Sequence, residues 1–297
     1  MKTLSLLLLA TSLCWTATAA EKKIIEIGTK PESVCRGFGG KLYVTMLNGS
    51  EPGDGEIKVL DGDESKVFAK GLNNPKGMAF VGGFLVVSDE TMVRKIDKKG
   101  KVSVLAAAKD FPKEVTFLND VAASRDGKSV YVTDMSHPKW MFEADRKLWP
   151  VDSEKAIAPM TGCVYKVTLD GEVSLAVPPG DKKMPGPNGV TVIGKKDQET
   201  LLMGDFFTGN IVSYADKKFR VVAKGMRGAD AVEVMGSKIY VSSWPLGKVW
   251  SYDRKTKKTT VLADDLTTAA DFYLDRKGKQ LVIPDMLAGK IVFLPIE

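Results

Sequence analysis

Leu118–Asp134, with the sequence LNDVAASRDGKSVYVTD, is the stretch that decides the fold. It contains a short polar cluster, an apolar run, a turn with the Asp-Gly signal, and a second apolar run. The same arrangement occurs in Pro75–Asp89 (PKGMAFVGGFLVVSD) and in Pro187–Asp205 (PNGVTVIGKKDQETLLMGD). Three related starts complete a set of six: Pro31–Val34, Ala229–Val232 and Ala269–Phe272.

A repeat of roughly 40–45 residues built from short strands is typical of a β-propeller with one blade per repeat. We therefore predict an all-β chain in which residues 21–297 form a single six-bladed β-propeller domain. The last repeat supplies only three strands before Glu297, and Lys23–Ile27 is the simplest source of the fourth. We expect this N-terminal strand to join the last blade and close the ring, because closure removes an exposed strand edge.

Residues 1–20 have the composition of a secretory signal peptide. Met1 and Lys2 precede the apolar run Leu6–Ala10, and the small residues Ala17–Ala20 follow. This pattern predicts a periplasmic or secreted monomer without a membrane anchor. The formal charge of +6 is mild, and the Lys-rich stretches lack interleaved aromatic residues. We therefore expect no nucleic-acid partner.

Cysteine and histidine are scarce, which limits the chemistry that is available. Cys35 and Cys163 follow the predicted signal peptide, and they could form a disulfide or remain buried thiols. His137 is the only histidine, and neither cysteine has a partner at ligand spacing, which argues against a metal site of cysteine and histidine ligands. A Ser-His-Asp mechanism would need His137 itself, which lies before Pro138 in a loop typical of surface histidines.

One position of the repeat varies while the framework around it stays similar. Its occupants, blade by blade, are Glu32, Lys76, Asn119, Asn188, Asp230 and Ala270. Because each of them opens an innermost strand, we expect their side chains to meet at the mouth of the central channel. The two carboxylates and two carboxamides in this set are hard oxygen ligands. They suit calcium or magnesium, with manganese or zinc as less natural alternatives. The competing interpretation is that these are ordinary turn residues.

The spacing of this position shows one long insertion. Asn119 and Asn188 are 69 residues apart, whereas the other intervals are 40 to 44 residues. The excess corresponds to residues 135–161, which include Trp140 and Trp149. Antiparallel pairing places the start of this segment on the face that carries the variable residues. Long loops in compact domains are usually functional or disordered. We therefore expect a lid over the site; the alternative is a loop that packs only on its own blade.

The motifs that open the blades resemble those of the regucalcin and gluconolactonase-like six-bladed propellers. The resemblance extends over essentially the whole chain after residue 20. It rests on four motifs: Pro31–Val34, Leu118–Val121, Pro187–Val190 and Ala229–Val232. It implies that Glu32, Asn188 and Asp230 bind one divalent cation. It also implies that Asn119 holds the metal's water or the substrate, and that the activity is hydrolysis of sugar lactones.

Two departures from this family argue against a sugar substrate. Phe117 stands where members that act on sugar lactones tend to carry an Arg, and Ala231 stands where Gly is usual. A pocket with Phe117, and with Trp140 or Trp149 from the lid, would be more apolar than a sugar site requires.

From these features we expect an exported, divalent-cation-dependent hydrolase of a small-molecule lactone or ester, with calcium favoured. Asp230 is the candidate metal ligand that also serves as general base. The alternative is a non-catalytic propeller that binds a ligand or a protein and holds a structural cation.

Overall fold

The structure is a computed structural model that describes residues 21–155 and 160–297. The predicted signal peptide, residues 1–20, lies outside the described residues. Among the residues that are described, no helix is both long enough and apolar enough to span a membrane.

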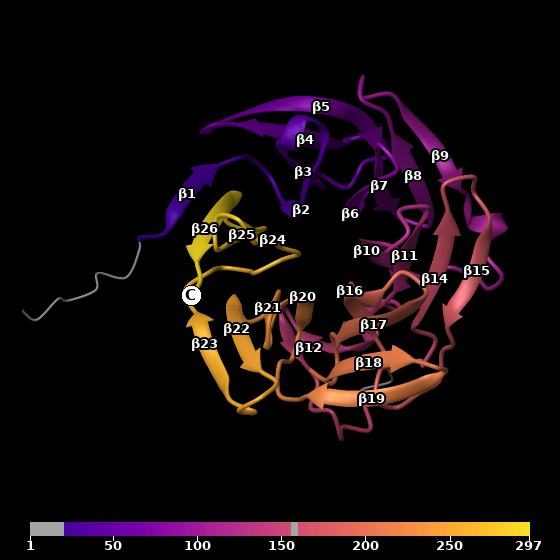
Figure 1. Cartoon of the computed structure of the whole chain (residues 1–297), viewed down its shortest axis with the longest axis vertical. Coiled ribbons are helices and arrows are strands. Elements are labelled where there is room, and N and C mark those ends of the chain that lie inside the picture. Colours follow the sequence, from indigo (N-terminus) through magenta and orange to yellow (C-terminus); the bar gives the residue numbers. More distant parts are fainter. Residues whose placement is uncertain (1–20, 156–159) are drawn as a thin grey trace, which may run out of the picture.

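Six four-stranded antiparallel sheets are arranged as blades around a central axis (Figure 1). From the axis outwards, the first blade contains β2 (Pro31–Arg36), β3 (Leu42–Met46), β4 (Gly55–Asp61) and β5 (Glu64–Leu72). The second contains β6 (Pro75–Val81), β7 (Phe84–Asp89), β8 (Met92–Ile96) and β9 (Val102–Ala106). The third contains β10 (Leu118–Ala123), β11 (Ser129–Asp134), β14 (Cys163–Thr168) and β15 (Val173–Val177).

The remaining three blades follow the same order from the axis outwards. The fourth contains β16 (Pro187–Lys195), β17 (Gln198–Asp205), β18 (Ile211–Ala215) and β19 (Lys218–Ala223). The fifth contains β20 (Ala229–Met235), β21 (Lys238–Ser243), β22 (Lys248–Asp253) and β23 (Thr259–Ala263). The sixth contains β24 (Tyr273–Asp275), β25 (Gln280–Asp285), β26 (Lys290–Pro295) and β1 (Lys23–Glu26). The predicted six-bladed propeller is confirmed.

The ring closes between the two ends of the chain. Strand β1 pairs with β26 in antiparallel register, with Lys23 opposite Phe293 and Glu26 opposite Lys290. The N-terminal strand thus completes the last blade, as the strand count of the sequence predicted. Lys290 Nζ and a Glu26 carboxylate oxygen lie 3.3 Å apart across this seam.

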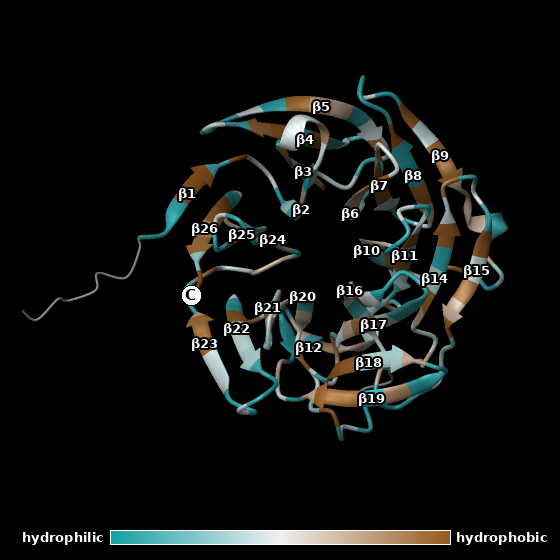
Figure 2. Ribbon diagram, viewed as in Figure 1, coloured by the Kyte–Doolittle hydropathy of each residue, from teal (hydrophilic) through white to brown (hydrophobic). Residues whose placement is uncertain are grey.

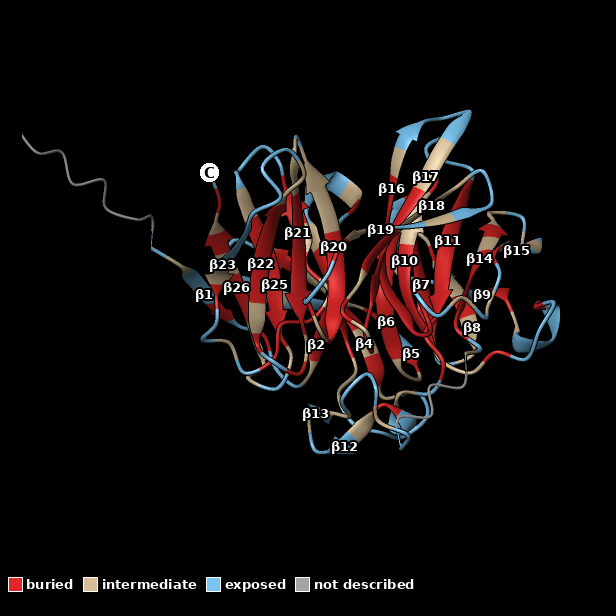
Figure 3. Ribbon diagram, turned by 90° about the horizontal axis from the view of Figure 1, so that it is seen from below, coloured by how far each residue is buried: buried red, intermediate tan, exposed pale blue. Residues whose placement is uncertain are grey.

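The hydrophobic core lies between neighbouring blades. Val86 of β7 belongs to the same buried cluster as Val132 of β11, and Leu202 of β17 belongs to that of Val241 of β21. Strand β11 is buried along its whole length, whereas the outermost strands β15 and β23 are partly exposed. Apolar residues run along the strands of the blades (Figure 2), and exposure is concentrated at the loops (Figure 3). This pattern reflects sheets that are covered on both faces near the axis.

A β-bulge lies at the start of the innermost strand in five of the six blades. In each, the pairing with the second strand shifts between the first and fourth residues of the motif. The shifts are Pro31/Val34, Pro75/Met78, Leu118/Val121, Pro187/Val190 and Ala229/Val232. The variable second residue of the motif therefore lies inside the bulge. Because a bulge changes the direction of a side chain relative to regular pleating, it orients these residues.

The insertion after β11 contains regular structure as well as loops. It begins with the 3₁₀ turn η3 (Pro138–Trp140) and continues as the hairpin β12 (Phe142–Ala144) and β13 (Lys147–Leu148). Two further 3₁₀ turns lie elsewhere, η1 (Phe38–Gly40) and η2 (Ala108–Asp110). Figure 3 shows the hairpin projecting from one end of the ring. The sequence predicted a loop here, and periodicity gave no signal for strands as short as these two.

Contacts to other blades hold the insertion in place. Met141 is fully buried in a cluster with Phe206 and Phe207, which follow β17 of the fourth blade. Arg227 Nη2 donates a hydrogen bond of 2.6 Å to the carbonyl of Trp149. Arg146 Nη1 donates one of 2.8 Å to the carbonyl of Thr267. The insertion therefore does not pack only on the third blade.

The two cysteines that lie within residues 21–155 and 160–297 are separate buried thiols. Cys35 lies on β2 and Cys163 on β14, and neither forms a disulfide. Burial raises the pKa of Cys163 to about 11 and that of Cys35 further still. Neither thiol is therefore a ready nucleophile, since the thiolate is the reactive form.

Candidate functional site

The repeat brings four polar side chains from four blades to one cavity. Glu32, Asn119, Asn188 and Asp230 line a cavity of ≈ 210 Å³ at the end of the channel that faces the insertion. Each is buried, and each is the second residue of its innermost strand. The structure thus brings together the three predicted metal ligands and Asn119.

One oxygen of each of these four side chains has no partner. The atoms Glu32 Oε2, Asn119 Oδ1, Asn188 Oδ1 and Asp230 Oδ1 are buried and accept no hydrogen bond from any described residue. Buried polar atoms are nearly always paired, and an unpaired one costs roughly 1–3 kcal/mol. Asn74, which lines the same cavity, has a fifth such oxygen, Oδ1. These atoms around a single cavity therefore mark a place where a ligand supplies the missing partners.

Burial of the carboxylates shifts their protonation strongly. Desolvation raises the pKa of Glu32 to about 8, although the positive charge of Lys76 opposes the shift. The pKa of Asp230 is also raised well above its ordinary range, first by desolvation and then by the charges of Glu32 and Asp120. An empty site of this kind favours protonated carboxyls, and a bound cation would favour the charged forms.

Lys76 lines the same cavity and was not among the predicted site residues. It is 5% exposed, and its ammonium lies 4.4 Å from the ring centroid of Phe117. Burial lowers its pKa, and the charges of Glu32, Asp89 and Glu90 oppose this shift. The sequence did carry the signal, because Lys76 occupies the variable position of the second repeat.

The apolar walls come from a second equivalent position that the sequence analysis did not identify. It is the residue that immediately follows the second strand of a blade. Five blades place an apolar side chain there: Leu47, Met135, Phe206, Trp244 and Met286. The second blade has Glu90 instead, which is exposed. Aligning the repeats at this residue would have revealed the wall, since four of the five are Met or aromatic.

Phe117 lines the cavity, as predicted, but Trp140 does not. Trp140 is 47% exposed, and its ring lies under the ammonium of Lys139 at 4.7 Å. The insertion contributes Pro138 and Phe142 in its place. The rings of Phe142 and Phe206 are 5.8 Å apart in an edge-on contact. The prediction for Trp140 is therefore corrected: the apolar residues that follow it turn inward, and its own ring remains outside.

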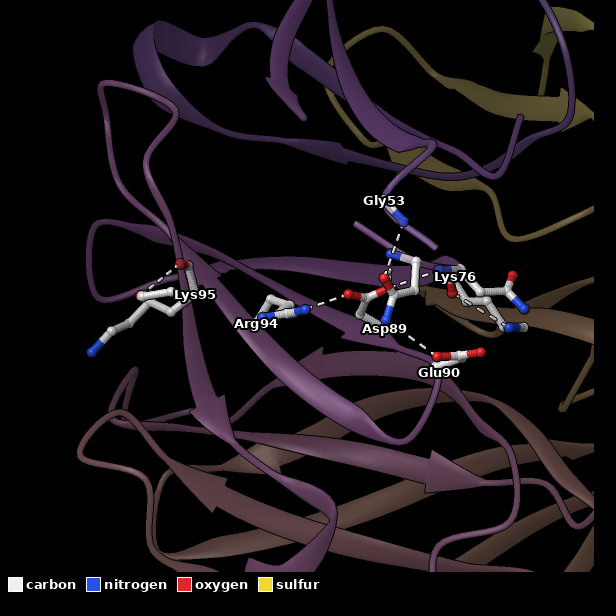
Figure 4. A network of polar contacts seen from close by, with 9 residues as sticks. Gly53, Lys76, Asp89, Glu90, Arg94 and Lys95 are labelled. Atoms are coloured by element: carbon white, nitrogen blue, oxygen red, sulfur yellow. Dashed lines mark hydrogen bonds and ion pairs between the residues drawn. The ribbon is translucent and has the colours of Figure 1, made fainter. Parts of the chain in front are cut away.

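Buried aspartates at the ends of the second strands hold the segments that lead into the site. Asp134 accepts backbone hydrogen bonds of 2.9 Å from Thr116 and from Phe117. Asp89 accepts bonds of 2.8 and 2.7 Å from the backbone of Asn73 and Asn74, and it pairs with Arg94 at 2.9 Å. Figure 4 shows this second network beside Lys76. These carboxylates have backbone partners and hold the loops in place.

Hydroxyl groups of the second strands hold two of the cavity residues, Lys76 and Asn119, to the neighbouring blade. Thr45 Oγ1 donates a hydrogen bond of 2.9 Å to the carbonyl of Lys76, and Ser88 Oγ donates one to the carbonyl of Asn119. Close approach of the inner strands supports the same arrangement. A Cβ at Gly189 would lie 2.0 Å from the carbonyl oxygen of Asp230, so only glycine fits there.

Two further carboxylates lie deeper in the channel. Asp120 accepts hydrogen bonds of 2.6 Å from the backbone of Val121 and of Val190, and burial raises its pKa to about 7. Asp271 accepts a hydrogen bond from the hydroxyl of Ser33, and burial raises its pKa too. These contacts join the third blade to the fourth and the sixth to the first, which is a structural role.

His137 lies near the start of the insertion and does not line the cavity. Its ring is 5.9 Å from that of Phe117, and its Nδ1 accepts a hydrogen bond of 3.2 Å from the backbone of Lys139. The arrangement gives His137 a capping role at the start of η3.

The donor set is compatible with a hard divalent cation. Two carboxylates and two carboxamides supply oxygen ligands of the kind that calcium and magnesium prefer. Among the described residues, no group of three or more His, Cys, Asp or Glu side chains is placed to hold a metal ion. Any cation here would therefore depend on Asn119 or Asn188 as well as on Glu32 and Asp230.

The comparisons with known proteins identify the fold. No protein-family profile and no curated protein sequence matches the chain. A chain in the crystal structure of a nidogen/laminin complex is similar, with a TM-score of 0.58 and 16% sequence identity. The match covers 78% of this chain and 79% of that chain. At this identity it supports a six-bladed propeller and nothing finer, so the resemblance to the regucalcin family stays a prediction.

Proposed function

We propose that the cavity binds one divalent cation, with calcium favoured, through Glu32, Asn188 and Asp230. The observation that carries this proposal is the set of five buried oxygens without hydrogen-bond partners around one cavity, four from the variable position of the repeat and one from Asn74. A cation satisfies all of them at once, whereas a neutral ligand would need several correctly placed donors. The carboxamides of Asn119 and Asn188 add neutral oxygen donors, which coordinate without increasing the negative charge.

We propose further that the occupied site hydrolyses a lactone or an ester. A bound divalent cation polarises a carbonyl and lowers the pKa of a bound water. Asp230 would hold one oxygen toward the cation and use the other to accept the proton of the attacking water. Asn119 would orient the substrate or the water. Phe117 and Phe142 would bind the apolar part of the substrate and exclude bulk water.

A non-catalytic binding propeller is the second candidate. Two observations favour it. The walls of the cavity are mostly apolar, and one structurally similar chain comes from the crystal structure of a nidogen/laminin complex. In this case the cation would stabilise the ring by mass action, because it binds only the folded chain.

A panel of small lactones and aryl esters separates the two candidates. Residues 21–297 would be stripped of metal and refilled with calcium, magnesium, manganese or zinc. Hydrolysis that returns with one cation, and that is lost in Glu32→Gln and Asp230→Asn, supports the hydrolase. The matched control is Asp264→Asn, at an exposed carboxylate outside the cavity.

Two other outcomes are informative. Cation binding without turnover of any ester or lactone favours the binding propeller. Hydrolysis at the wild-type rate by Asp230→Asn with its cation bound rules out the general-base role of Asp230. The cation content of each variant must therefore be measured alongside its activity.

A further inference from the structure

Lys76 occupies the same position in the bulge of its inner strand as the oxygen donors do in theirs. It is the second residue of β6, and its side chain lines the cavity together with Glu32 and Asp230. Its carbonyl accepts the hydroxyl of Thr45, as the carbonyl of Asn119 accepts that of Ser88. The fold thus places an ammonium among the oxygen donors.

This ammonium has few partners within the protein. Lys76 Nζ donates one long hydrogen bond of 3.4 Å to the carbonyl of Asn74 and lies above the ring of Phe117. The ion pairs formed by the described residues do not include it. Since an ammonium carries three donors, it retains donors for a group that enters the cavity.

Glu32 does not satisfy this ammonium. The two side chains line the same cavity, yet Glu32 Oε2 accepts no hydrogen bond from any described residue. Opposite charges that are buried without direct pairing are costly to maintain. The separation therefore points to two different ligand groups, a cation beside the carboxylates and an anion beside Lys76.

We propose that Lys76 is a specificity-determining residue that binds the carboxylate of a small ligand with an apolar body. The inference rests on the proposed cation site, whose positive charge would act on the carboxylate together with that of Lys76. Glu32, Asp230 and Lys76 together carry a formal charge of −1, and a divalent cation changes it to +1. The occupied site is therefore selective for an anion.

The walls define the rest of the ligand. Phe117, Phe142 and Trp244 give the cavity aromatic sides, and Met135 and Met286 add polarisable apolar surface. The volume of ≈ 210 Å³ is below the roughly 300–1,000 Å³ of pockets for drug-sized ligands. A short aromatic or aliphatic carboxylate fits this apolar surface.

The test compares phenylacetate with phenylacetamide, a neutral ligand of the same shape, by calorimetric titration of the calcium-loaded protein. The wild type is expected to bind phenylacetate at least about ten-fold more tightly, the size of one hydrogen bond to a charged group. In Lys76→Met this ratio should fall to about one. The exposed Lys70→Met is the matched control and should keep the ratio of the wild type. Lys76→Gln replaces the methionine variant if the latter does not fold.

Three results would overturn the inference. The first is a wild type that shows no preference for phenylacetate over phenylacetamide. The second is a Lys76→Met variant that retains the preference of the wild type, which would mean that the cation alone binds the anion. The third is tighter binding of phenyl phosphate, titrated in parallel, than of phenylacetate.

Calcium titration separates this inference from the proposed function. Lys76→Met should bind calcium at least as tightly as the wild type, because it loses a repelling charge. A wild type that binds no calcium rules out the cation site. Calcium binding by a wild type that shows no preference for phenylacetate would overturn the Lys76 inference alone.

Discussion

At the residue scale, the candidate site consists of polar atoms that the fold buries without pairing. The sequence predicted Glu32, Asn119, Asn188 and Asp230 because they recur at one position of a repeat. The same repeat position placed Lys76 at the cavity, although the sequence assigned it no role there. The sequence did not predict that Trp140 remains outside. That outcome depends on the direction in which a side chain leaves a short turn, and composition and spacing do not determine this direction.

Asn188 tests whether the neutral donors matter. Asn188→Ala removes a buried oxygen that has no partner in the protein, so it costs little in the empty form. We expect calcium affinity to fall by at least about 10–100-fold, the range seen when supporting residues of metal sites are lost. Calorimetric titration checks this, with thermal unfolding in EDTA to show that the variant is folded. An unchanged affinity would remove Asn188 from the ligand set.

The raised pKa of Glu32 predicts an unusual dependence of stability on pH. The carboxyl has an ordinary pKa of 4.5 when unfolded and about 8 when folded, so the folded chain binds more protons between these values. Stability of the metal-free protein should therefore fall as pH rises from about 4.5 to about 8. Glu32→Gln should flatten this fall, and calcium should reverse it. Thermal unfolding midpoints measured in EDTA across this range should fall as pH rises. Midpoints that stay constant would contradict the prediction.

At the element scale, the bulge in the inner strands and the residue after the second strand build the site together. The bulge orients the polar floor, and the following residues, such as Phe206 and Trp244, supply the apolar wall. The polar half was visible in the sequence because Glu, Asn and Asp stand out among apolar runs. The apolar half was not, since Met and Phe beside a strand resemble ordinary core residues.

Phe142 of the insertion should affect ligand binding and leave the cation site intact. Its ring lines the cavity and packs against Phe206 and Trp244. Phe142→Ala is expected to weaken binding of the apolar ligand by about ten-fold or more, since it removes part of a buried aromatic contact. Calcium affinity should stay within about two-fold of the wild type. Trp140→Ala, an exposed residue of the same segment, is the control.

At the scale of the whole molecule, the repeat determines the fold and the closure determines its stability. Six blade-sized repeats and a last repeat one strand short predicted both the ring and its seam. The sequence could not predict the β12–β13 hairpin, because its strands are short and are positioned by contacts with other blades. Local sequence patterns do not predict contacts between residues that are far apart in the chain.

Removal of β1 should destabilise the whole ring rather than one blade. A chain that begins at Ile27 loses the pairing of β1 with β26 and leaves an open strand edge in the sixth blade. We expect a lower unfolding midpoint and a tendency to associate, measured by calorimetry and by light scattering. A truncated chain as stable and as monomeric as residues 21–297 would show that the seam contributes little.

The central claim is that the four unpaired oxygens form a cation site. Titration of metal-stripped residues 21–297 with calcium tests it most directly. The account predicts saturable binding of one ion per chain, with release of protons near neutral pH, and loss of this binding in Glu32→Gln but not in Asp264→Asn. Absence of binding, or equal binding by the wild type and Glu32→Gln, would contradict it.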